Sequence, residues 1–363
     1  MKLAVTQENL SKALSIVGRV AQNKSSLPVL SNILLRADNN RLLLAATNLE
    51  IAITQYIGAK IHSDGAITIP ARLLSDYIAN LPKGTITLEL EKNKLHITTD
   101  NYRSTMNGVS ADEFPELPQI TEPQTMKIAS NVLKEAITQT ILTTSHDETR
   151  PILTGVYIHT HAGALYCAAT DGYRLSEKQL ISTDDEIQAI VPTQSLQDVL
   201  RVVPDDCDEV DVLMDDQQIR FLMGDIEITS RLIQGKFPDY RQLIPASTEI
   251  EFTSKKDELA RITKIASLFA RESGGSITIK TDSAKGTVSI HSLASQLGEN
   301  TSEITSHPSG DGSVTLNSRY LIDALGVIDS GEIHFGFSGK LAPCVVKPAK
   351  NSAYTHIIMP LKS

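Results

Sequence analysis

The same markers occur along this sequence at nearly constant spacing. The segment Pro28–Ser31 recurs with conservative changes as Pro151–Thr154, 123 residues later. Another marker begins at Pro70, at Pro192 and at Asn317, and so reaches the last third of the chain. Solenoid repeats have periods of roughly 20–50 residues. A period of about 120 residues therefore indicates a small domain copied in series, and three copies account for the 363 residues.

Each repeat is expected to open with a strand followed by an amphipathic helix. The first repeat places its apolar residues on one helical face, namely Leu10, Ala13, Leu14, Val17 and Ala21. The third repeat has the same pattern at Leu259, Ile262, Ile265, Ala266 and Phe269. Thr6, Ser130 and Ser254 precede the three helices and are the expected N-caps.

A second helix is expected at the later marker of each repeat, because proline suits the first turn of a helix. Its apolar face in the first repeat would comprise Leu73, Leu74, Tyr77, Ile78 and Leu81. Short β-rich runs at 33–37, 42–47, 86–91 and 94–99 are typical of antiparallel sheet. The sequence therefore predicts an α+β fold of three tandem domains, each with two helices packed on antiparallel sheet. The expected domains are 1–123, 124–247 and 248–363.

Composition narrows the class of protein. With 41% hydrophobic and 21% charged residues, the chain has an ordinary globular composition. The opening residues Met1–Thr6 contain no apolar signal region and no apolar run approaches 18 residues, so a cytoplasmic location is expected. Three distant cysteines, Cys167, Cys207 and Cys344, are expected to be buried free thiols.

The motifs of catalysis are absent from the sequence. It contains no Walker-type phosphate loop, no dinucleotide fingerprint and no metal-binding spacing of histidine or cysteine. The densest ionisable run, His146–Glu148, is typical of a solvated loop. We therefore expect no catalytic residue, no cofactor and no metal site.

Basic residues recur in equivalent helices although the net charge is −9. The basic residues of interest are Lys12, Arg19, Lys24, Arg72, Arg201, Lys256, Arg261, Lys264, Arg271 and Arg319. They form either ordinary solvated faces or a surface that faces a polyanion. Aromatic residues make up only 4% of the chain and tryptophan is absent, which disfavours stacking on single strands. If nucleic acid binds, contact with the phosphates of a duplex, without sequence preference, is favoured.

Three segments together carry a resemblance to a known family. Thr170–Leu175, Phe237–Arg241 and Ile358–Leu361, within the threefold repeat, resemble the β sliding clamps of bacterial DNA polymerase III. The resemblance covers the whole chain. It implies a head-to-tail homodimer that closes into a ring of six domains, with helices lining the hole and sheets outside.

The resemblance also implies a function. The ring would encircle duplex DNA and act as a processivity factor, a non-catalytic subunit of the polymerase III holoenzyme. Expected partners are a second copy, duplex DNA, the polymerase α subunit, the clamp loader and other proteins with a clamp-binding motif, and no membrane. The alternative is a scaffold or enzyme that reuses the repeated fold without encircling DNA.

The family's peptide-binding cleft between the second and third domains maps onto two sets of residues. The second domain would contribute Arg150, Leu153, Thr170, Gly172, Tyr173, Arg174, Leu175, Pro238 and Leu243. The third would contribute Asn317, Tyr320, Leu341, Pro343, Ile357, Ile358, Met359, Pro360 and Leu361. Tyr173 replaces the histidine of better-known members, Gln242 replaces an arginine, and 273–276 lacks the family's frequent aromatic residue.

The other surfaces follow from the same resemblance. The DNA-facing residues would be Lys12, Arg19, Lys24, Arg72, Arg201 and Lys264. At the dimer interface, Arg103 and Met106 would face Leu268, Phe269, Glu299 and Glu303 of the other chain. The alternative for Leu268 and Phe269 is a place in the core of their own domain.

Overall fold

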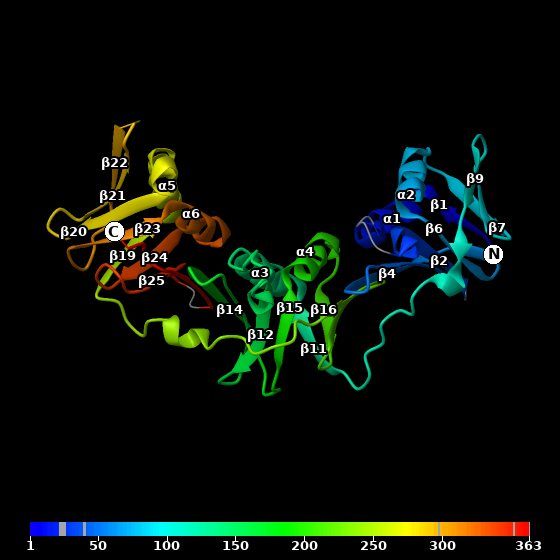
Figure 1. Cartoon of the computed structure of the whole chain (residues 1–363), viewed down its shortest axis with the longest axis horizontal. Helices are drawn as coiled ribbons and strands as arrows, with labels where there is room; N and C mark the ends of the chain where they lie inside the picture. Colours follow the sequence, from blue (N-terminus) through cyan, green and yellow to red (C-terminus); the bar gives the residue numbers. More distant parts are fainter. Residues whose placement is uncertain (22–26, 39–40, 297, 351–352, 363) are drawn as a thin grey trace. The chain divides into compact units, whose positions relative to one another are not determined.

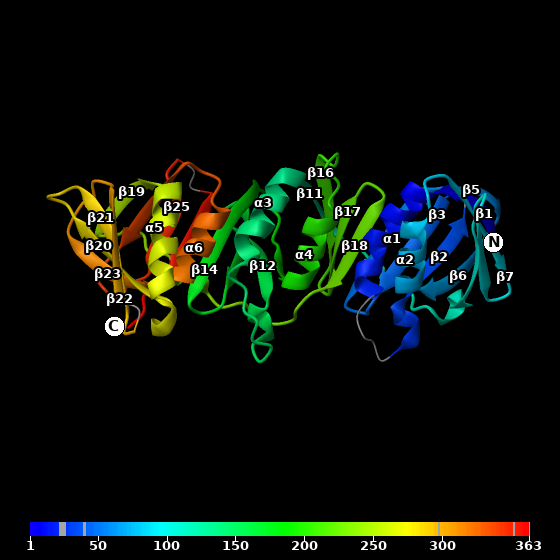
Figure 2. The same ribbon diagram turned by 90° about the horizontal axis from the view of Figure 1, so that it is seen from above.

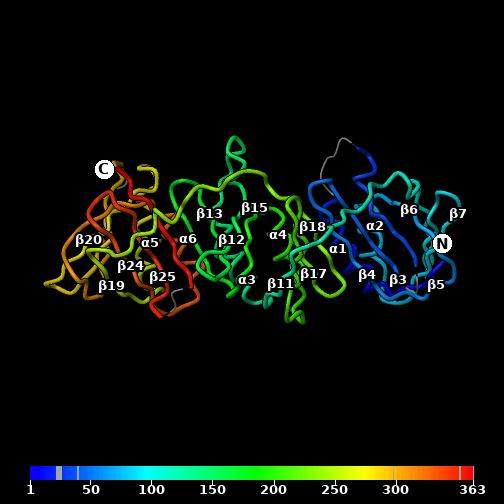
Figure 3. The backbone as a smooth tube through the Cα atoms, turned by 90° about the horizontal axis from the view of Figure 1, so that it is seen from below, coloured from blue at the N-terminus to red at the C-terminus, as the bar shows by residue number. Residues whose placement is uncertain are grey.

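The computed structural model of the protein describes residues 1–21, 27–38, 41–296, 298–350 and 353–362. Its contacts divide the chain into two compact units. Unit 1 comprises Met1–Ser130 with Asp198–Leu232, and unit 2 comprises Asn131–Gln197 with Ile233–Ser363. Figures 1 and 2 label most of the elements, and the backbone trace in Figure 3 shows the chain returning to unit 1, where β18 (Ile226–Arg231) lies beside β4 (Ile51–Gly58).

The described residues form two α-helices for each repeat, as predicted. They are α1 (Gln7–Ala21), α2 (Ala71–Asn80), α3 (Ser130–Ile141), α4 (Thr193–Val202), α5 (Lys256–Phe269) and α6 (Ser318–Val327). All five residues assigned to the apolar face of α1 are buried. Two apolar assignments are wrong: Leu73 on α2 is 54% exposed and Ile265 on α5 is 39% exposed. Both lie at the margin of a helical stripe, where periodicity does not distinguish a buried side chain from an exposed one.

The helix starts differ from the predicted caps in two repeats. Thr6 Oγ1 accepts a hydrogen bond from Asn9 N at 3.4 Å, as expected of a cap. Ser130 is instead the first residue of α3, and Ser254 precedes α5 by two positions and donates to the Lys255 carbonyl. Pro70 ends a strand directly before α2 rather than lying in the first turn.

Unit 1 contains two antiparallel sheets. The five-stranded sheet has the order β5 (Lys60–Ser63), β1 (Lys2–Thr6), β7 (Thr85–Glu91), β8 (Lys94–Thr98) and β9 (Arg103–Asn107). The nine-stranded sheet has the order β10 (Val109–Ser110), β6 (Gly65–Pro70), β2 (Asn32–Asp38), β3 (Arg41–Thr47), β4 (Ile51–Gly58), β18 (Ile226–Arg231), β17 (Gln218–Met223), β16 (Glu209–Met214) and β11 (Gln124–Ala129). Helix α1 packs on α2, β3 and β4.

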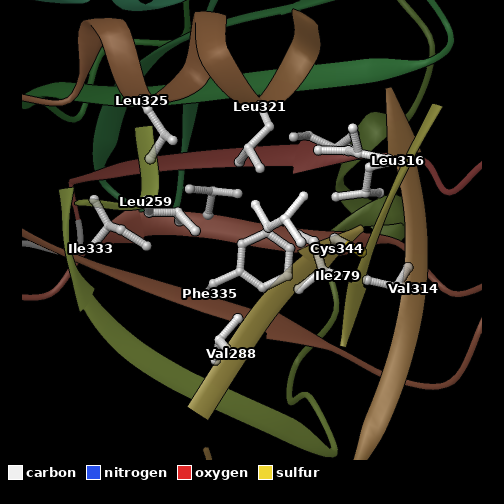
Figure 4. Packing of buried hydrophobic residues seen from close by; sticks show 14 of the residues in the cluster. Leu259, Ile279, Val288, Val314, Leu316, Leu321, Leu325, Ile333, Phe335 and Cys344 are labelled. Atoms are coloured by element: carbon white, nitrogen blue, oxygen red, sulfur yellow. The ribbon is translucent and has the colours of Figure 1, made fainter. Parts of the chain in front are cut away.

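Unit 2 repeats this plan. Its eight-stranded sheet has the order β15 (Gln188–Pro192), β12 (Gly155–His161), β13 (Ala164–Thr170), β14 (Arg174–Ser182), β26 (Tyr354–Ile358), β25 (Cys344–Pro348), β24 (Glu332–Phe337) and β19 (Ile250–Lys255). Its four-stranded sheet has the order β22 (Gly298–Thr305), β21 (Thr287–Ala294), β20 (Ser276–Asp282) and β23 (Gly312–Asn317). Leu259, Leu321 and Phe335 converge in the core between helices and sheets (Figure 4).

Strand pairing joins consecutive repeats. In unit 1, β4 of the first repeat pairs with β18 of the second, with Ile51 opposite Ser230. In unit 2, β14 of the second repeat pairs with β26 of the third, with Arg174 opposite Ile358. Each junction is therefore a continuous sheet. Strands β9 and β22 each lie at the edge of their sheet.

Candidate functional site

The β14–β26 junction brings together apolar residues that lie far apart in the sequence. Leu175 on β14 is directly opposite Ile357 on β26. Both belong to one buried cluster with Leu153, Ala168, Ile190, Phe237, Tyr240 and Val345, against which Met359 packs. Ile358, in contrast, faces the other side of the sheet and belongs to the core around Phe335. We call the cluster and its exposed rim the β14–β26 site.

A tight turn leads into β14 at this site. Thr170 Oγ1 accepts from Gly172 N at 3.0 Å and donates to the Arg174 carbonyl at 2.7 Å. Asp171 Oδ1 accepts from Tyr173 N and Arg174 N, at 2.9 and 3.0 Å. Gly172 has a φ of 92°, a conformation that glycine adopts without strain. The turn leaves the ring of Tyr173 exposed at the rim.

Arg174 connects this turn to the third repeat. Its side chain is only 12% exposed and pairs with Asp171 at 3.1 Å and with Asp323 on α6 at 2.7 Å. The guanidinium also lies 4.5 Å from the centre of the Tyr320 ring, and burial raises the pKa of Tyr320. Because two carboxylates neutralise Arg174, this residue fixes the turn against α6 rather than presenting a free charge.

The segments that enter the buried cluster also carry exposed apolar side chains, which we take as the rim of the β14–β26 site. Tyr173 is 62% exposed, Leu243 42% and Leu341 66%. Arg150 and Pro238 are also exposed, and the Arg150 guanidinium pairs with Asp147 at 3.1 Å. Large exposed side chains next to a buried apolar cluster are typical of a surface that binds an apolar partner.

The C-terminal segment is anchored by its backbone at this site. Met359 N donates to the Tyr173 carbonyl and Leu361 N to the Thr315 carbonyl, at 2.9 and 2.8 Å. Met359, Pro360, Leu361 and Pro343 are partly buried. Asn317 ends β23, and its side chain caps α6 by accepting from Arg319 N at 2.9 Å.

A polar network that the sequence analysis missed supports the site from inside. His159 Nε2 lies 2.7 Å from Tyr240 Oη, and the Tyr240 hydroxyl donates to Glu177. Arg241 pairs with Glu177 at 2.8 Å and stacks 4.5 Å from the Tyr166 ring centre. Burial raises the pKa of Tyr240 and lowers that of His159 to about 4, so both groups are neutral at pH 7.

Aromatic stacking completes the support. Tyr157 stacks on His159 with ring centres 4.4 Å apart, and on Phe237 at 4.8 Å. Tyr157 and His159 are two residues apart on β12 and therefore share one face of the strand, so this spacing in the sequence indicates an aromatic face. The network holds Phe237 and Tyr240 against β12, and so fixes the segment that ends at Leu243.

Comparison with known proteins decides the family. Models of the DNA polymerase III beta subunit match the chain in three consecutive stretches: the N-terminal domain over residues 1–118, the central domain over 127–239 and the C-terminal domain over 241–362. The chain belongs to this family.

Individual relatives agree with this assignment. The beta sliding clamp of Synechococcus elongatus is 32% identical over 373 residues, covering 100% of this chain and 99% of that protein. The beta sliding clamp of Staphylococcus aureus is 28% identical, with both proteins covered completely. Crystal structures of the DNA polymerase sliding clamp from Bacillus subtilis and of the griselimycin-bound clamp from Pseudomonas aeruginosa match with TM-scores of 0.96 and 0.95, both at 27% identity. Each covers 100% of this chain, and 99% and 100% of those chains respectively.

The expected three-domain clamp fold is thereby confirmed, as is the function of a non-catalytic processivity subunit of DNA polymerase III. The alternative of a scaffold or enzyme that reuses the fold is not favoured. Within the described part of the clamp, no cluster of three or more His, Cys, Asp or Glu side chains could hold a metal ion. The described helices are too short or too polar to cross a membrane.

The three cysteines are free thiols, but they differ in burial. Cys167 and Cys344 are buried, and burial raises the pKa of each to about 12. Cys207 is partly exposed, so the prediction of burial is wrong for this residue. It lies in the turn before β16, outside the packed sheets.

Most of the candidate DNA-facing residues have exposed side chains. Lys12 and Arg19 on α1, Arg72 on α2, Arg201 on α4 and Lys264 on α5 are exposed, and Lys24 lies outside the described residues. Arg72 pairs weakly with Asp76 at 3.8 Å, and Arg201 with Asp198 at 3.5 Å. In contrast, the Lys256 ammonium donates to the Ile328 carbonyl at 3.0 Å, so this charge is directed at the end of α6.

The candidate interface residues lie on the edge strands β9 and β22 and on α5. Arg103 is exposed on β9, whereas Met106 on the same strand is only 3% exposed. Glu299 and Glu303 are exposed on β22. Leu268 is 52% exposed on α5, which excludes it from the core of its own domain, and Phe269 is partly buried.

Proposed function

We propose that this clamp closes into a ring by pairing β9 of one chain with β22 of a second. The single observation that carries the proposal is the repeated junction: β4 pairs with β18, β14 pairs with β26, and the equivalent strands β22 and β9 are edges. An unpaired edge is a template for strand addition. A head-to-tail contact of this kind closes only if the rotation per chain does, which a two-chain ring of six similar domains satisfies.

The internal junctions also give the register of the proposed contact. At the two internal junctions, the first residue of one strand lies opposite a buried residue: Ile51 opposite Ser230, and Arg174 opposite Ile358. The first residue of β22 is Gly298, and the corresponding buried residue on β9 is Met106. Pairing Gly298 with Met106 places Arg103 opposite Thr301. Residues two positions away on a neighbouring strand lie within reach of a long side chain. Arg103 would therefore lie between Glu299 and Glu303, with opposite charges.

Cysteine cross-linking tests this register. The variant Arg103→Cys with Thr301→Cys, in a Cys207→Ser background, should form a covalent dimer under oxidation, because directly opposed residues have the Cα separation that a disulfide needs. Arg103→Cys paired with Thr305→Cys is the matched control and should cross-link poorly. Efficient cross-linking of the control alone would contradict the register. A monomer in solution would contradict the proposal that two chains form a ring.

Within the ring, we infer that the exposed basic helices face duplex DNA. Lys12, Arg19 and Arg72 lie on the paired helices of the first repeat, and Arg201 and Lys264 on helices of the second and third. Contacts with phosphate carry no sequence information, and encirclement retains DNA without tight binding. Retention on closed circular duplex, with loss after linearisation, tests encirclement. Equal loss from both forms would contradict it.

We further propose that the β14–β26 site binds a short extended peptide of the polymerase and other partners. Support comes from the exposed Tyr173, Leu243 and Leu341 around the buried cluster. Apolar anchors of this kind carry most of the affinity in peptide recognition. The resemblance adds Arg150, Pro238, Asn317, Tyr320, Pro343 and the C-terminal segment to the same surface.

Titration with a labelled pentapeptide, Ser-Leu-Ser-Leu-Phe, tests this assignment. Leu243→Asp should weaken binding by about thirtyfold or more, without unfolding the protein, because the side chain is already 42% exposed. Leu27→Asp is the matched control, since Leu27 is 47% exposed in unit 1. Unchanged affinity in Leu243→Asp would place the peptide elsewhere.

Two further inferences complete the proposal. The sequence markers support boundaries at 1–123, 124–247 and 248–363. The first of these boundaries falls in the gap between the family matches, from 118 to 127, whereas the second break in the matches, between 239 and 241, precedes the boundary proposed at 247. Because bacterial DNA replication takes place in the cytoplasm, we infer that the clamp resides there.

A further inference from the structure

A cavity of about 410 Å³ lies in unit 1 at the β4–β18 junction. Its wall includes Leu49, Glu50, Ala52, Glu116, Pro118 and Arg231. These residues come from the turn before β4 and from β4 itself, from the segment after β10 and from the end of β18. The cavity belongs to none of the surfaces assigned above.

The turn at this cavity is built like the turn at the β14–β26 site. Thr47 Oγ1 accepts from Leu49 N and donates to the Ile51 carbonyl, at 3.0 Å each. Asn48 Oδ1 accepts from Glu50 N and Ile51 N, at 3.0 and 2.8 Å. These are the same four hydrogen bonds that Thr170 and Asp171 form, 123 residues later. The cavity therefore occupies the position in unit 1 that the β14–β26 site occupies in unit 2.

Leu49 departs from that pattern in an informative way. Its φ is 76°, a left-handed conformation that costs energy for any residue with a Cβ, and the equivalent residue is Gly172. Leu49 is 48% exposed, so burial does not fully offset this cost. Strained residues persist chiefly at functional positions such as ligand clamps. An exposed leucine held at the mouth of a cavity can act as an apolar anchor.

The charges at the cavity indicate which partner fits. Glu50, Glu116 and Arg231 are exposed, and in the described structure none of the three has an ion-pair partner within 4.0 Å. Two carboxylates that make no ion pair with the described residues, against one guanidinium, favour a cationic ligand group beside the apolar anchor. At the β14–β26 site, by contrast, the charge of Arg174 is neutralised by Asp171 and Asp323.

We propose that this cavity is a second peptide-binding site, selective for a short extended segment that carries a lysine or arginine next to an aliphatic or aromatic residue. The apolar side chain packs on Leu49 and Pro118, and the cation lies between Glu50 and Glu116. That the ligand is a peptide rests on the function proposed for the β14–β26 site. The two sites would then let one chain hold two partners of different charge.

Two matched peptides test the proposal on the full-length protein. The labelled pentapeptide Lys-Leu-Lys-Leu-Phe should bind at two sites per chain, and Ser-Leu-Ser-Leu-Phe at one. Leu49→Gly and Glu116→Gln should each weaken binding of the basic peptide at one site by about tenfold, and leave the neutral peptide unaffected. Leu243→Asp should weaken binding of the neutral peptide, and of the basic peptide at its other site, and should leave binding at the unit 1 cavity unaffected. Both unit 1 changes are compatible with folding, because glycine is at ease at positive φ and Glu116 is exposed.

The outcomes separate this inference from the function on which it rests. If the basic peptide binds once per chain and only Leu243→Asp weakens it, the second site is refuted and the β14–β26 assignment stands. If Leu49→Gly weakens the basic peptide while Leu243→Asp affects neither peptide, the second site stands and the β14–β26 assignment falls. If neither peptide responds to any of these variants, both are refuted.

Discussion

The buried ring of His356 should make unit 2 sensitive to mild acid. His356 lies on β26 with no exposed surface, and its Nδ1 is 2.9 Å from the Tyr354 hydroxyl. Its Nε2 is buried and has no hydrogen-bond partner in the described structure. Burial, together with the smaller effect of the nearby Arg174 charge, lowers the pKa of His356 to about 3. The folded protein therefore keeps this ring neutral at every pH above that value.

The size of the effect follows from the difference between the folded and unfolded pKa. In the unfolded chain a histidine has a pKa of about 6.5, so the unfolded state binds more protons between that value and about 3. The stabilisation is fully present above pH 6.5 and is lost as the pH falls towards the folded pKa. Between pH 7 and pH 5 the loss amounts to about 2 kcal/mol, a large share of a typical stability of about 5–15 kcal/mol.

Urea unfolding at pH 7 and pH 5, followed by far-UV circular dichroism at fixed protein concentration, measures this loss. Hydrogen exchange at β14 and β26, corrected for intrinsic rates, assigns the transition to unit 2. His356→Gln and His356→Leu should each reduce the pH-dependent loss by about 2 kcal/mol, whatever their stability at pH 7. The control His62→Gln, at an exposed position on β5, should keep the full loss. If both His356 variants lose as much stability as the wild type, the buried neutral ring is not the cause.

Three further predictions concern the network, the strained turn and the basic helices. Tyr240→Phe removes the hydroxyl shared by His159 and Glu177, and should lower the free energy of unfolding by about 1–3 kcal/mol in thermal or urea denaturation; an unchanged midpoint would show that the network is not stabilising. Leu49→Gly removes a left-handed strain of about 1–2 kcal/mol and adds an entropic cost of about 0.5–1 kcal/mol for glycine. The melting temperature should therefore stay level or rise, and a clear fall would show that Leu49 is not strained. Arg19→Gln with Arg72→Gln should reduce the salt dependence of retention on circular duplex by a slope of roughly one per lost phosphate contact, whereas Lys60→Gln on β5 should leave it unchanged.

Helices and strands of this clamp follow from local patterns, because period and spacing determine which face of an element is apolar. Every predicted helix is present, and the runs at 33–37 and 42–47 lie within β2 and β3. The errors occur where burial depends on tertiary neighbours. Leu73 and Ile265 satisfy a helical stripe and are still exposed, since the width of the contact with the sheet decides how much of the stripe is covered.

The candidate site could not be assembled from local patterns in the same way. Leu175 and Ile357 meet because β14 pairs with β26, and no periodicity in either strand specifies its partner. The resemblance placed both residues in one cleft, but it also placed Ile358 there, although this residue faces the opposite side of the sheet. Side chains alternate between the faces of a strand, so a one-residue difference decides whether an apolar residue contacts a ligand or the core.

The same junction between repeats recurs along the chain with different residues at its surface. The β4–β18 and β14–β26 junctions keep the same strand register and the same hydrogen-bonded turn, because these depend on the backbone and on Thr47 and Thr170. The residues at the tips are free to differ: Leu49 and Glu50 stand where Gly172 and Tyr173 stand in the next repeat. The third member of the series has no partner strand within the chain, since β22 and β9 lie at sheet edges. The same geometry that pairs strands of consecutive repeats twice within the chain therefore leaves β9 and β22 as edges to which a strand of a second chain can add.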